Sequence, residues 1–150
     1  MAHLQNMPPR TRANVEKLDC PVFETTPFVA GPALNQRRVA VVSSAGIHAR
    51  DDKTFALSSS DFRKMSATDD ILMSHVSVNY DRTGFVQDIN TVLPVDRLAE
   101  LADDGVIGSV AQSHYSFMGA TDPTEMAPYA AQVAGMLKAD QVDAVLLVPV

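Results

Sequence analysis

The sequence of 150 residues contains one cysteine, no tryptophan and no long apolar run, and these scarcities exclude whole classes of protein. A single cysteine, Cys20, cannot form an internal disulfide, so a reducing cytoplasmic location is expected. No apolar segment approaches the ~18 residues of a membrane-spanning helix. Residues 1–12 also lack the apolar core of a secretion signal. We therefore expect a cytoplasmic protein that does not insert into a membrane.

Basic residues are also scarce. Twelve Lys and Arg face 18 Asp and Glu, which gives a formal net charge of −6 at pH 7. Nucleic acids and anionic membrane surfaces are bound through basic surfaces, so neither is expected as a partner. The hydrophobic content of 46% is sufficient for the core of one domain.

Proline is concentrated at the start of the chain. Residues 1–34 hold five of the nine prolines, which predicts an irregular leader ahead of an α/β domain over residues 35–150. Cys20 lies in this leader without a neighbouring histidine or a helix start that would lower its pKa, so we interpret it as unreactive.

The domain itself alternates between strand and helix signals. Asp122 and Pro123 are typical of a helix start, and Gly105 is typical of a helix end. This alternation predicts βαβ units, and hence a three-layer α/β fold with a mostly parallel sheet and flanking helices. The predicted elements are strands at residues 39–42, 71–80, 106–110 and 144–150 and helices at residues 94–104 and from residue 123 onward.

The last predicted strand has six apolar residues among its seven, which is typical of a strand buried on both faces of a parallel sheet. Open α/β sheets bind ligands beyond the carboxyl ends of their strands. We therefore expect the site where the segments 43–48 and 111–120 meet whatever follows Val150.

These segments carry His48 and His114, and an imidazole there can transfer a proton or bind a substrate carboxylate. A structural hydrogen bond is the alternative for each. Ser44 and Gly46 form a small-residue turn in which the backbone can approach an anion. The sequence has no dinucleotide or phosphate-loop fingerprint, no His-x-x-x-His pair and no Gly-x-Ser-x-Gly elbow. We therefore expect no metal and no cofactor in this chain.

The densest polar stretch is residues 75–84. Strand alternation places His75, Ser77 and Asn79 on one face. Arg82 either binds a substrate carboxylate or pairs with Asp81 to brace the turn. No complete catalytic set is present, and the candidate substrate-binding residues are Ser44, Gly46, His48, His75, Asn79, Arg82, His114 and Tyr115.

Several stretches together resemble the selenoprotein B family of the glycine, sarcosine, betaine and D-proline reductases. They are residues 38–48, 73–84, 105–110, 114–123 and 142–150, so the resemblance runs from about Ala30 onward and leaves the leader out. It implies a reductase that cleaves a carbon–nitrogen bond next to a carboxylate, with an amino acid or betaine as its small-molecule substrate. It further implies partner subunits, one of them carrying a pyruvoyl group, and a selenocysteine or cysteine nucleophile immediately after Val150.

Two other functions remain open from the residues alone. One is a non-catalytic α/β protein that binds a small ligand or a partner. The other is a hydrolase or lyase built on His48, His75 and His114, which lacks an evident nucleophile. We also expect a homo-oligomer, because an apolar final strand without a cover favours self-association.

The resemblance predicts the gene sequence beyond the Val150 codon. We expect UGA, or a cysteine codon, followed by an in-frame continuation, and we expect the chain to be inactive without it. Sequencing the gene through this point checks the expectation. Any other sense codon, or a stop codon other than UGA, would contradict it.

Overall fold

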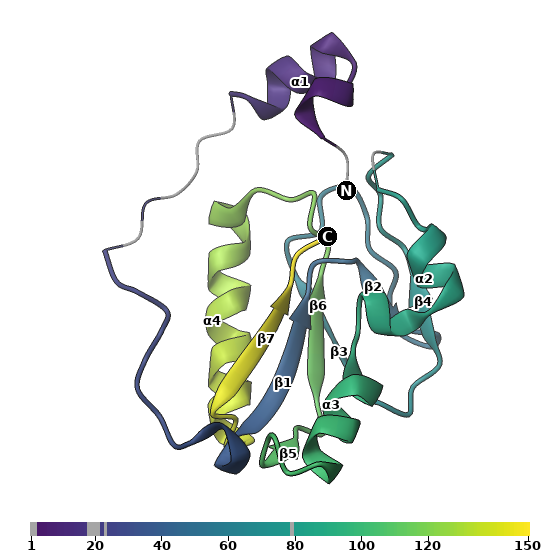
Figure 1. Ribbon diagram of the computed structural model, residues 1–150. Helices are drawn as coiled ribbons and strands as arrows, with labels where there is room; N and C mark the ends of the chain where they lie inside the picture. Colours follow the sequence, from purple (N-terminus) through teal and green to yellow (C-terminus); the bar gives the residue numbers. More distant parts are fainter. Residues whose placement is uncertain (1–2, 18–21, 23, 79) are drawn as a thin grey trace.

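The computed structural model describes residues 3–17, 22, 24–78 and 80–150, and its centre is a five-stranded, mostly parallel sheet (Figure 1). β1 (Arg38–Ser43) runs parallel to β7 (Ala144–Val148) on one side and to β5 (Ser109–Val110) and β6 (His114–Phe117) on the other. β3 (Phe62–Met65) pairs antiparallel with β6. The predicted α/β class with a mostly parallel sheet is confirmed.

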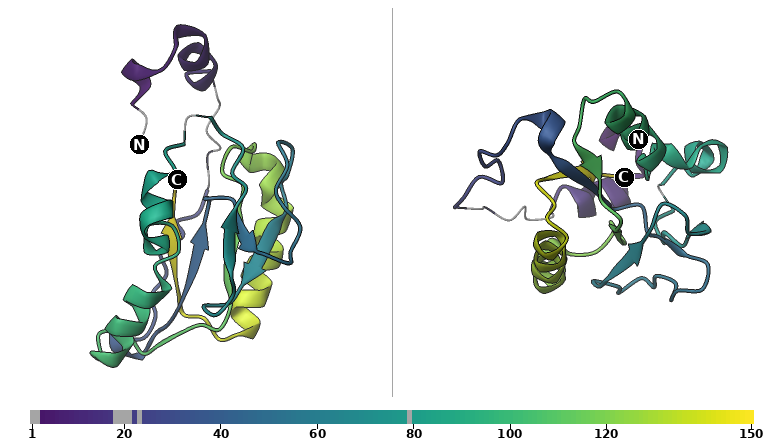
Figure 2. Two further views of the ribbon diagram at one scale, coloured as in Figure 1. Left: turned by 90° about the vertical axis from the view of Figure 1, so that its right-hand side faces the viewer. Right: turned by 90° about the horizontal axis from the view of Figure 1, so that it is seen from below.

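The side chains of β1 alternate between two cores, one on each face of the sheet. Val39 and Val41 pack with α3 (Val95–Asp103), while Ala40 packs with α4 (Pro123–Ala139). This is the period of two that a strand imposes on its side chains. Figures 1 and 2 show α4 on one side of the sheet and α3 on the other.

Smaller elements complete the fold. β2 (Ile47–Ala49) and β4 (Ile71–Met73) form a separate antiparallel pair. α1 (Pro9–Val15) and α2 (Thr83–Gln87) are short helices, and single 3-10 turns occur at η1 (Leu4–Asn6), η2 (Leu34–Gln36) and η3 (Ile89–Thr91). Within the described residues, no helix combines the length and the apolar character needed to cross a membrane.

Helix ends follow the sequence signals. The Asp122 carboxylate accepts a hydrogen bond of 2.8 Å from the Thr124 N–H at the start of α4, as an N-cap does. α3 lies inside the predicted range of residues 94–104, and Gly105 follows it with a φ of +70°. These local signals were sufficient because capping depends on residues within one turn.

Strand predictions failed where pairing with distant segments decides the structure. The strand expected over residues 71–80 ends at Met73, and residues 111–120 are not a loop, because they contain β6. β2 and β3 have no clear signal of their own and form by pairing with β4 and β6.

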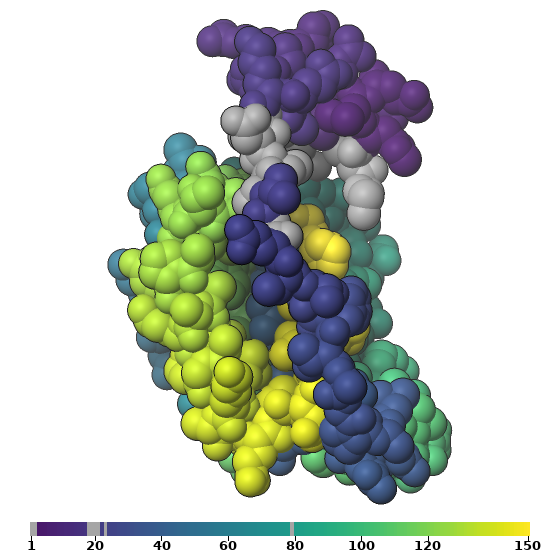
Figure 3. Space-filling view, turned by 90° about the vertical axis from the view of Figure 1, so that its left-hand side faces the viewer, coloured from purple at the N-terminus to yellow at the C-terminus, as the bar shows by residue number. Residues whose placement is uncertain are grey.

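The prediction that the last strand is buried on both faces is wrong. Among the described residues, β7 pairs with β1 alone and forms an edge of the sheet. Val145, Leu146 and Leu147 are 39%, 40% and 67% exposed. In Figure 3 the leader residues coloured blue cross beside β7 and leave parts of the yellow strand in view. The leader also contains α1, so it is not irregular throughout; Cys20 lies outside the described residues.

His114 supplies a hydrogen bond to β1 at a point where backbone pairing within the sheet is interrupted. β5 pairs with the start of β1 and β6 with its end, so the ladder has a gap opposite Val41. There the Val41 N–H donates to Nδ1 of the fully buried His114 over 3.1 Å. An accepting Nδ1 means that the neutral ring carries its proton on Nε2. Burial lowers the pKa of His114 to about 4, against a smaller opposing effect of Asp140.

This geometry predicts an acid-sensitive fold. The unfolded ring takes up a proton near pH 6.5 and the folded ring only near pH 4, so acidification across that window favours unfolding. Between pH 7 and pH 5 the loss of unfolding free energy from this group is on the order of 2 kcal/mol.

Urea unfolding of the wild type, His114→Asn and His114→Leu checks this. Asn retains an acceptor for Val41, whereas Leu leaves that N–H buried without a partner and should cost about 2 kcal/mol more at pH 7. In both variants the free energy of unfolding should no longer contain the pH-dependent contribution of His114. A wild type and an Asn variant with equal losses between pH 7 and pH 5 would contradict the assignment.

Candidate functional site

A hollow of about 600 Å³ lies at the carboxyl edge of the parallel strands. Figure 1 shows this edge beside the end of β7, with α1 above it. We call it the carboxyl-edge hollow. Its described lining comes from the leader, the segment after β4, the start of α2, the residues around η3 and the residues that follow β6 and β7. These residues are Met7, Val15, His75, Ser77, Tyr80, Asp81, Gly84, Thr91, Val92, Gly119, Ala120, Pro149 and Val150.

Ser44, in the turn after β1, joins three segments at this edge. Its backbone N–H donates to the Val148 carbonyl over 3.0 Å, and its hydroxyl oxygen accepts from the Val150 N–H over 2.9 Å. Its own carbonyl accepts from the Gly119 N–H over 2.9 Å. A Cβ at Gly119 would lie 2.7 Å from that carbonyl oxygen, so a side chain there would force the two backbones apart.

Gly46 connects the same turn to His75. Its N–H donates to the Phe117 carbonyl, and its carbonyl accepts from the Ser74 N–H, both over 2.9 Å. Its φ is +63°, and a Cβ there would lie 2.9 Å from the Cα of His75. Both the left-handed conformation and the close approach require glycine. The Ser44–Gly46 turn predicted from small residues thus exists, and it places His75 at the hollow.

His75 is held as a neutral hydrogen-bond donor. Its side chain is buried, and Nδ1 accepts from the Ser77 N–H over 3.1 Å, so the neutral ring carries its proton on Nε2. Nε2 is buried and has no hydrogen-bond partner among the described residues. Burial, and secondarily the charge of Arg82, lowers the pKa of His75. A buried donor without a partner is costly unless a ligand satisfies it.

Arg82 braces the segment that carries His75. One guanidinium nitrogen, Nη2, donates to the carbonyls of His75 and Ser77 over 2.5 and 3.2 Å. The guanidinium carbon lies 5.9 Å from the ring centroid of Tyr80, whose ring is 4.9 Å from that of His75. The expected brace between Asp81 and Arg82 is replaced: Asp81 accepts from the Thr83 N–H instead, over 2.9 Å.

Three other sequence candidates lie elsewhere. His48 is buried in β2, where its Nδ1 donates to the Ala49 carbonyl over 2.7 Å. His114 lies within the sheet rather than in the expected loop. Tyr115 is buried against α4, with its ring 5.8 Å from that of Phe62. The described lining of the carboxyl-edge hollow includes none of the three. Asn79 lies outside the described residues.

Sequence reasoning missed Tyr80 and the leader residues Met7 and Val15 as parts of this edge. Gly119 lies in the segment 111–120 that the sequence predicted at this edge, and a glycine after a strand permits close backbone approach. No sequence signal marked the leader residues, because their position depends on how the leader packs against the rest of the chain.

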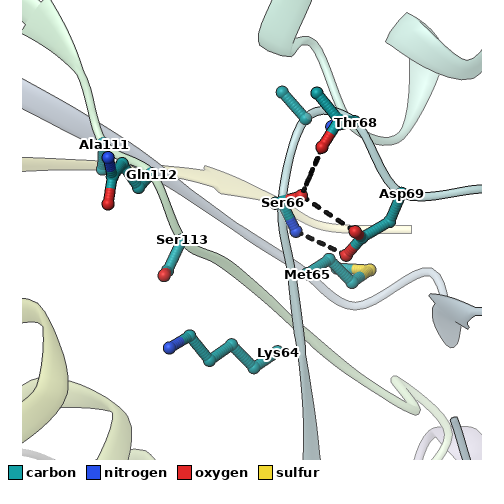
Figure 4. Close-up of a pocket in the computed structure, with 9 residues that line it drawn as sticks. Lys64, Met65, Ser66, Thr68, Asp69, Ala111, Gln112 and Ser113 are labelled. Carbon is teal, nitrogen blue, oxygen red and sulfur yellow. Dashed lines mark hydrogen bonds between the residues drawn. The ribbon is translucent and has the colours of Figure 1, made fainter.

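A second hollow of about 580 Å³ lies at the amino end of β6 and is lined by Lys64, Met65, Ser66, Ala67, Thr68, Asp69, Ala111, Gln112 and Ser113 (Figure 4). The Ser66 N–H and hydroxyl both donate to the Asp69 carboxylate, over 2.8 and 2.9 Å. These polar groups form hydrogen bonds with one another within their own turn. This second hollow, which we call the amino-edge hollow, is therefore the weaker candidate for a ligand-binding site.

Gly46 provides a stability test with a matched control. Gly46→Ala should lower the free energy of unfolding by about 2 kcal/mol or more, because it combines a left-handed φ with a backbone clash. Gly105→Ala has a similar φ of +70° but meets no atom within 4 Å, so it should cost only about 1 kcal/mol. Equal losses in urea unfolding would contradict the close packing of Gly46 on His75.

Two proteins of known name are similar to this chain over most of its length. The D-proline reductase subunit gamma of Acetoanaerobium sticklandii is 34% identical over 123 residues, which is 76% of this chain and 49% of that protein. The glycine reductase complex component B subunit gamma of Carboxydothermus hydrogenoformans is 33% identical over 144 residues, or 87% of this chain and 32% of that protein. The chain thus spans about half or less of the length of these relatives.

No solved structure matches the chain. The model of the glycine/sarcosine/betaine reductase selenoprotein B family matches residues 6–150, so the resemblance extends beyond residues 30–150 through most of the leader. With nearly the whole chain covered, this protein belongs to the glycine/sarcosine/betaine reductase selenoprotein B family.

Proposed function

We propose that this chain forms the substrate-facing part of a reductase that cleaves a carbon–nitrogen bond next to a carboxylate, with an amino acid or a betaine as substrate. The observation that carries the proposal is the carboxyl-edge hollow, where the buried neutral donor of His75 and the end of β7 line one space. The family name and the names of the two relatives point to the same reaction class.

The nucleophile, in this proposal, is a selenocysteine or cysteine that follows Val150 in the complete protein. Its anion attacks the α-carbon, and a carbon–selenium or carbon–sulfur bond forms as the carbon–nitrogen bond breaks. The amine leaves with the bonding electron pair and takes a proton. A dithiol then supplies two electrons and two protons in total and becomes a disulfide, while the carbon is released as the reduced carboxylate. A low pKa favours the attacking anion.

His75 binds the substrate carboxylate in this scheme. Its Nε2–H donates without carrying a charge, so the ring does not have to be desolvated as a cation. Arg82 holds the backbone of the His75 segment and adds positive charge nearby, which favours an anionic ligand. The hollow supplies apolar walls from Val92, Pro149 and Val150.

We further propose that partner subunits complete the site, as the relatives are named subunits of reductase complexes. A hollow of about 600 Å³ is in the range that accepts drug-sized ligands, so an amino acid leaves room for a second group. A pyruvoyl group on a partner subunit fits that room and would hold the substrate amine. The exposed apolar residues of β7 also support self-association.

A non-catalytic ligand-binding protein is the second candidate. The same unpartnered donor of His75 supports it, since a donor suited to a carboxylate binds one with or without subsequent chemistry. Binding of betaine or an amino acid to the complete protein, with no turnover under reducing conditions, would favour this candidate.

The reaction class is tested by comparing the 150-residue chain with the same chain continued by its natural downstream sequence or by a cysteine-containing equivalent. Glycine, sarcosine, betaine and D-proline are each offered with a dithiol and the partner subunits. We expect amine release, or ring opening for D-proline, only from the continued chain. Equal turnover by the 150-residue chain would refute the placement of the nucleophile.

The role of His75 is tested with two variants that separate its two ring nitrogens. His75→Asn keeps an acceptor for the Ser77 N–H but lacks the donor at the Nε2 position, so the KM should rise about tenfold. His75→Gln carries its amide nitrogen near the Nε2 position and should retain more affinity. Because burial lowers the pKa of His75 from its ordinary value, the KM of the wild type should stay flat between pH 7 and 8.

His48→Gln is the control, since His48 is equally buried but lies outside the described lining of the hollow. A His75→Asn variant with an unchanged KM, or a His48→Gln variant with the same rise, would contradict the role of His75.

A further inference from the structure

We infer that Ser44 is a positioning residue whose hydroxyl holds the Val150 backbone and interacts with the reactive residue that follows it. The inference rests on the proposed function for the identity of that residue, but its geometric basis is independent of any activity.

The sheet alone does not hold Val150. The pairing of β1 with β7 ends at the Ser43–Val148 pair, so the two residues after Val148 lie past the last rung of the ladder. At this point the Ser44 N–H donates to the Val148 carbonyl and the Ser44 hydroxyl accepts from the Val150 N–H over 2.9 Å. The side chain of Ser44 therefore extends the ladder by one further contact toward the hollow.

Ser44 is itself fixed from the opposite side. Gly119 donates its N–H to the Ser44 carbonyl, and a Cβ at Gly119 would lie 2.9 Å from the Ser44 Cβ and 3.0 Å from its hydroxyl oxygen. The absence of a side chain at Gly119 leaves just enough room for this serine. Ser44 is thus packed between the end of β6 and the end of β7, and its position determines where Val150 lies.

The Ser44 hydroxyl can still donate one hydrogen bond. Its oxygen accepts from Val150, whereas its own proton has no acceptor among the described residues. A hydroxyl beside the Val150 amide can donate that proton to a thiolate or selenolate on the following residue. Such a hydrogen bond stabilises the anion and makes it easier to form.

The neighbouring Ser43 is a matched control. Its side chain is buried, and its hydroxyl accepts from the Ala45 N–H over 3.2 Å, without a contact to Val150 among its described hydrogen bonds. Ser43→Ala and Ser44→Ala therefore remove the same group from adjacent residues, and only Ser44→Ala removes the contact with Val150.

The first measurement is amide hydrogen exchange of Val150 by NMR, in the full chain lengthened by one cysteine after Val150. Ser44→Ala should speed this exchange about tenfold, because the amide loses its acceptor. Ser43→Ala should leave it unchanged. Exchange at the parent rate in Ser44→Ala would overturn the inference.

The second measurement is the rate of alkylation of the added cysteine by iodoacetamide as a function of pH. Loss of the Ser44 hydroxyl should raise the pKa of this thiol and slow alkylation at pH 7 severalfold. A merely structural role would leave the midpoint in place. A Ser44→Ala profile that matches the parent, or the same shift in Ser43→Ala, would overturn the inference.

Turnover is measured in parallel, so that the two hypotheses can fail separately. In an active parent, Ser44→Ala should lower kcat about tenfold at an unchanged KM, since misplacement of a reacting group costs rate rather than ground-state affinity. An active parent whose kcat is unaffected by Ser44→Ala would contradict the inference. For this measurement the parent is the chain continued by its natural downstream sequence, assayed with the partner subunits. If that parent is inactive, the proposed function is refuted, and the alkylation profile still decides the role of Ser44.

Discussion

The carboxyl edge of this protein depends on close backbone approach at the turn after β1. Two positions without side chains, Gly46 and Gly119, bring His75 and the end of β6 against this turn. The turn then holds Val148 and Val150 through Ser44. The segments that carry His75, Gly119 and Val150 are therefore located relative to one three-residue connection, residues 44–46, so a small disturbance there affects all of them together.

Two buried histidines of this protein show how burial selects protonation states. His75 and His114 each accept a backbone N–H at Nδ1 and keep a buried Nε2–H, and burial lowers the pKa of both. His114 uses this state to close a gap in the sheet, whereas His75 presents it beside a hollow. A buried neutral imidazole thus stabilises the fold at His114 and, we propose, binds a ligand at His75.

The sequence allowed correct prediction of what depends on neighbouring residues. The α/β class, the cap at Asp122, the glycine after α3 and the small-residue turn at Ser44 and Gly46 all follow from local signals. It did not allow prediction of β2, β3 or β6, which form by pairing with distant strands. Among the site candidates, the positions of His48, His114 and Tyr115 could not be foreseen, because which face of an unpredicted strand a side chain occupies is set by tertiary register.

The most direct test of the central claim is a ¹H–¹⁵N NMR titration of the protein with betaine, glycine and D-proline. Location of the ligand at the carboxyl edge predicts that shifts concentrate at Ser44, Gly46, His75, Gly119 and Val150, with a hydrogen-bonded imidazole N–H signal from His75 Nε2. Shifts that concentrate instead around Lys64, Ser66 and Gln112 at the amino-edge hollow, or no shifts with any of these ligands, would contradict it.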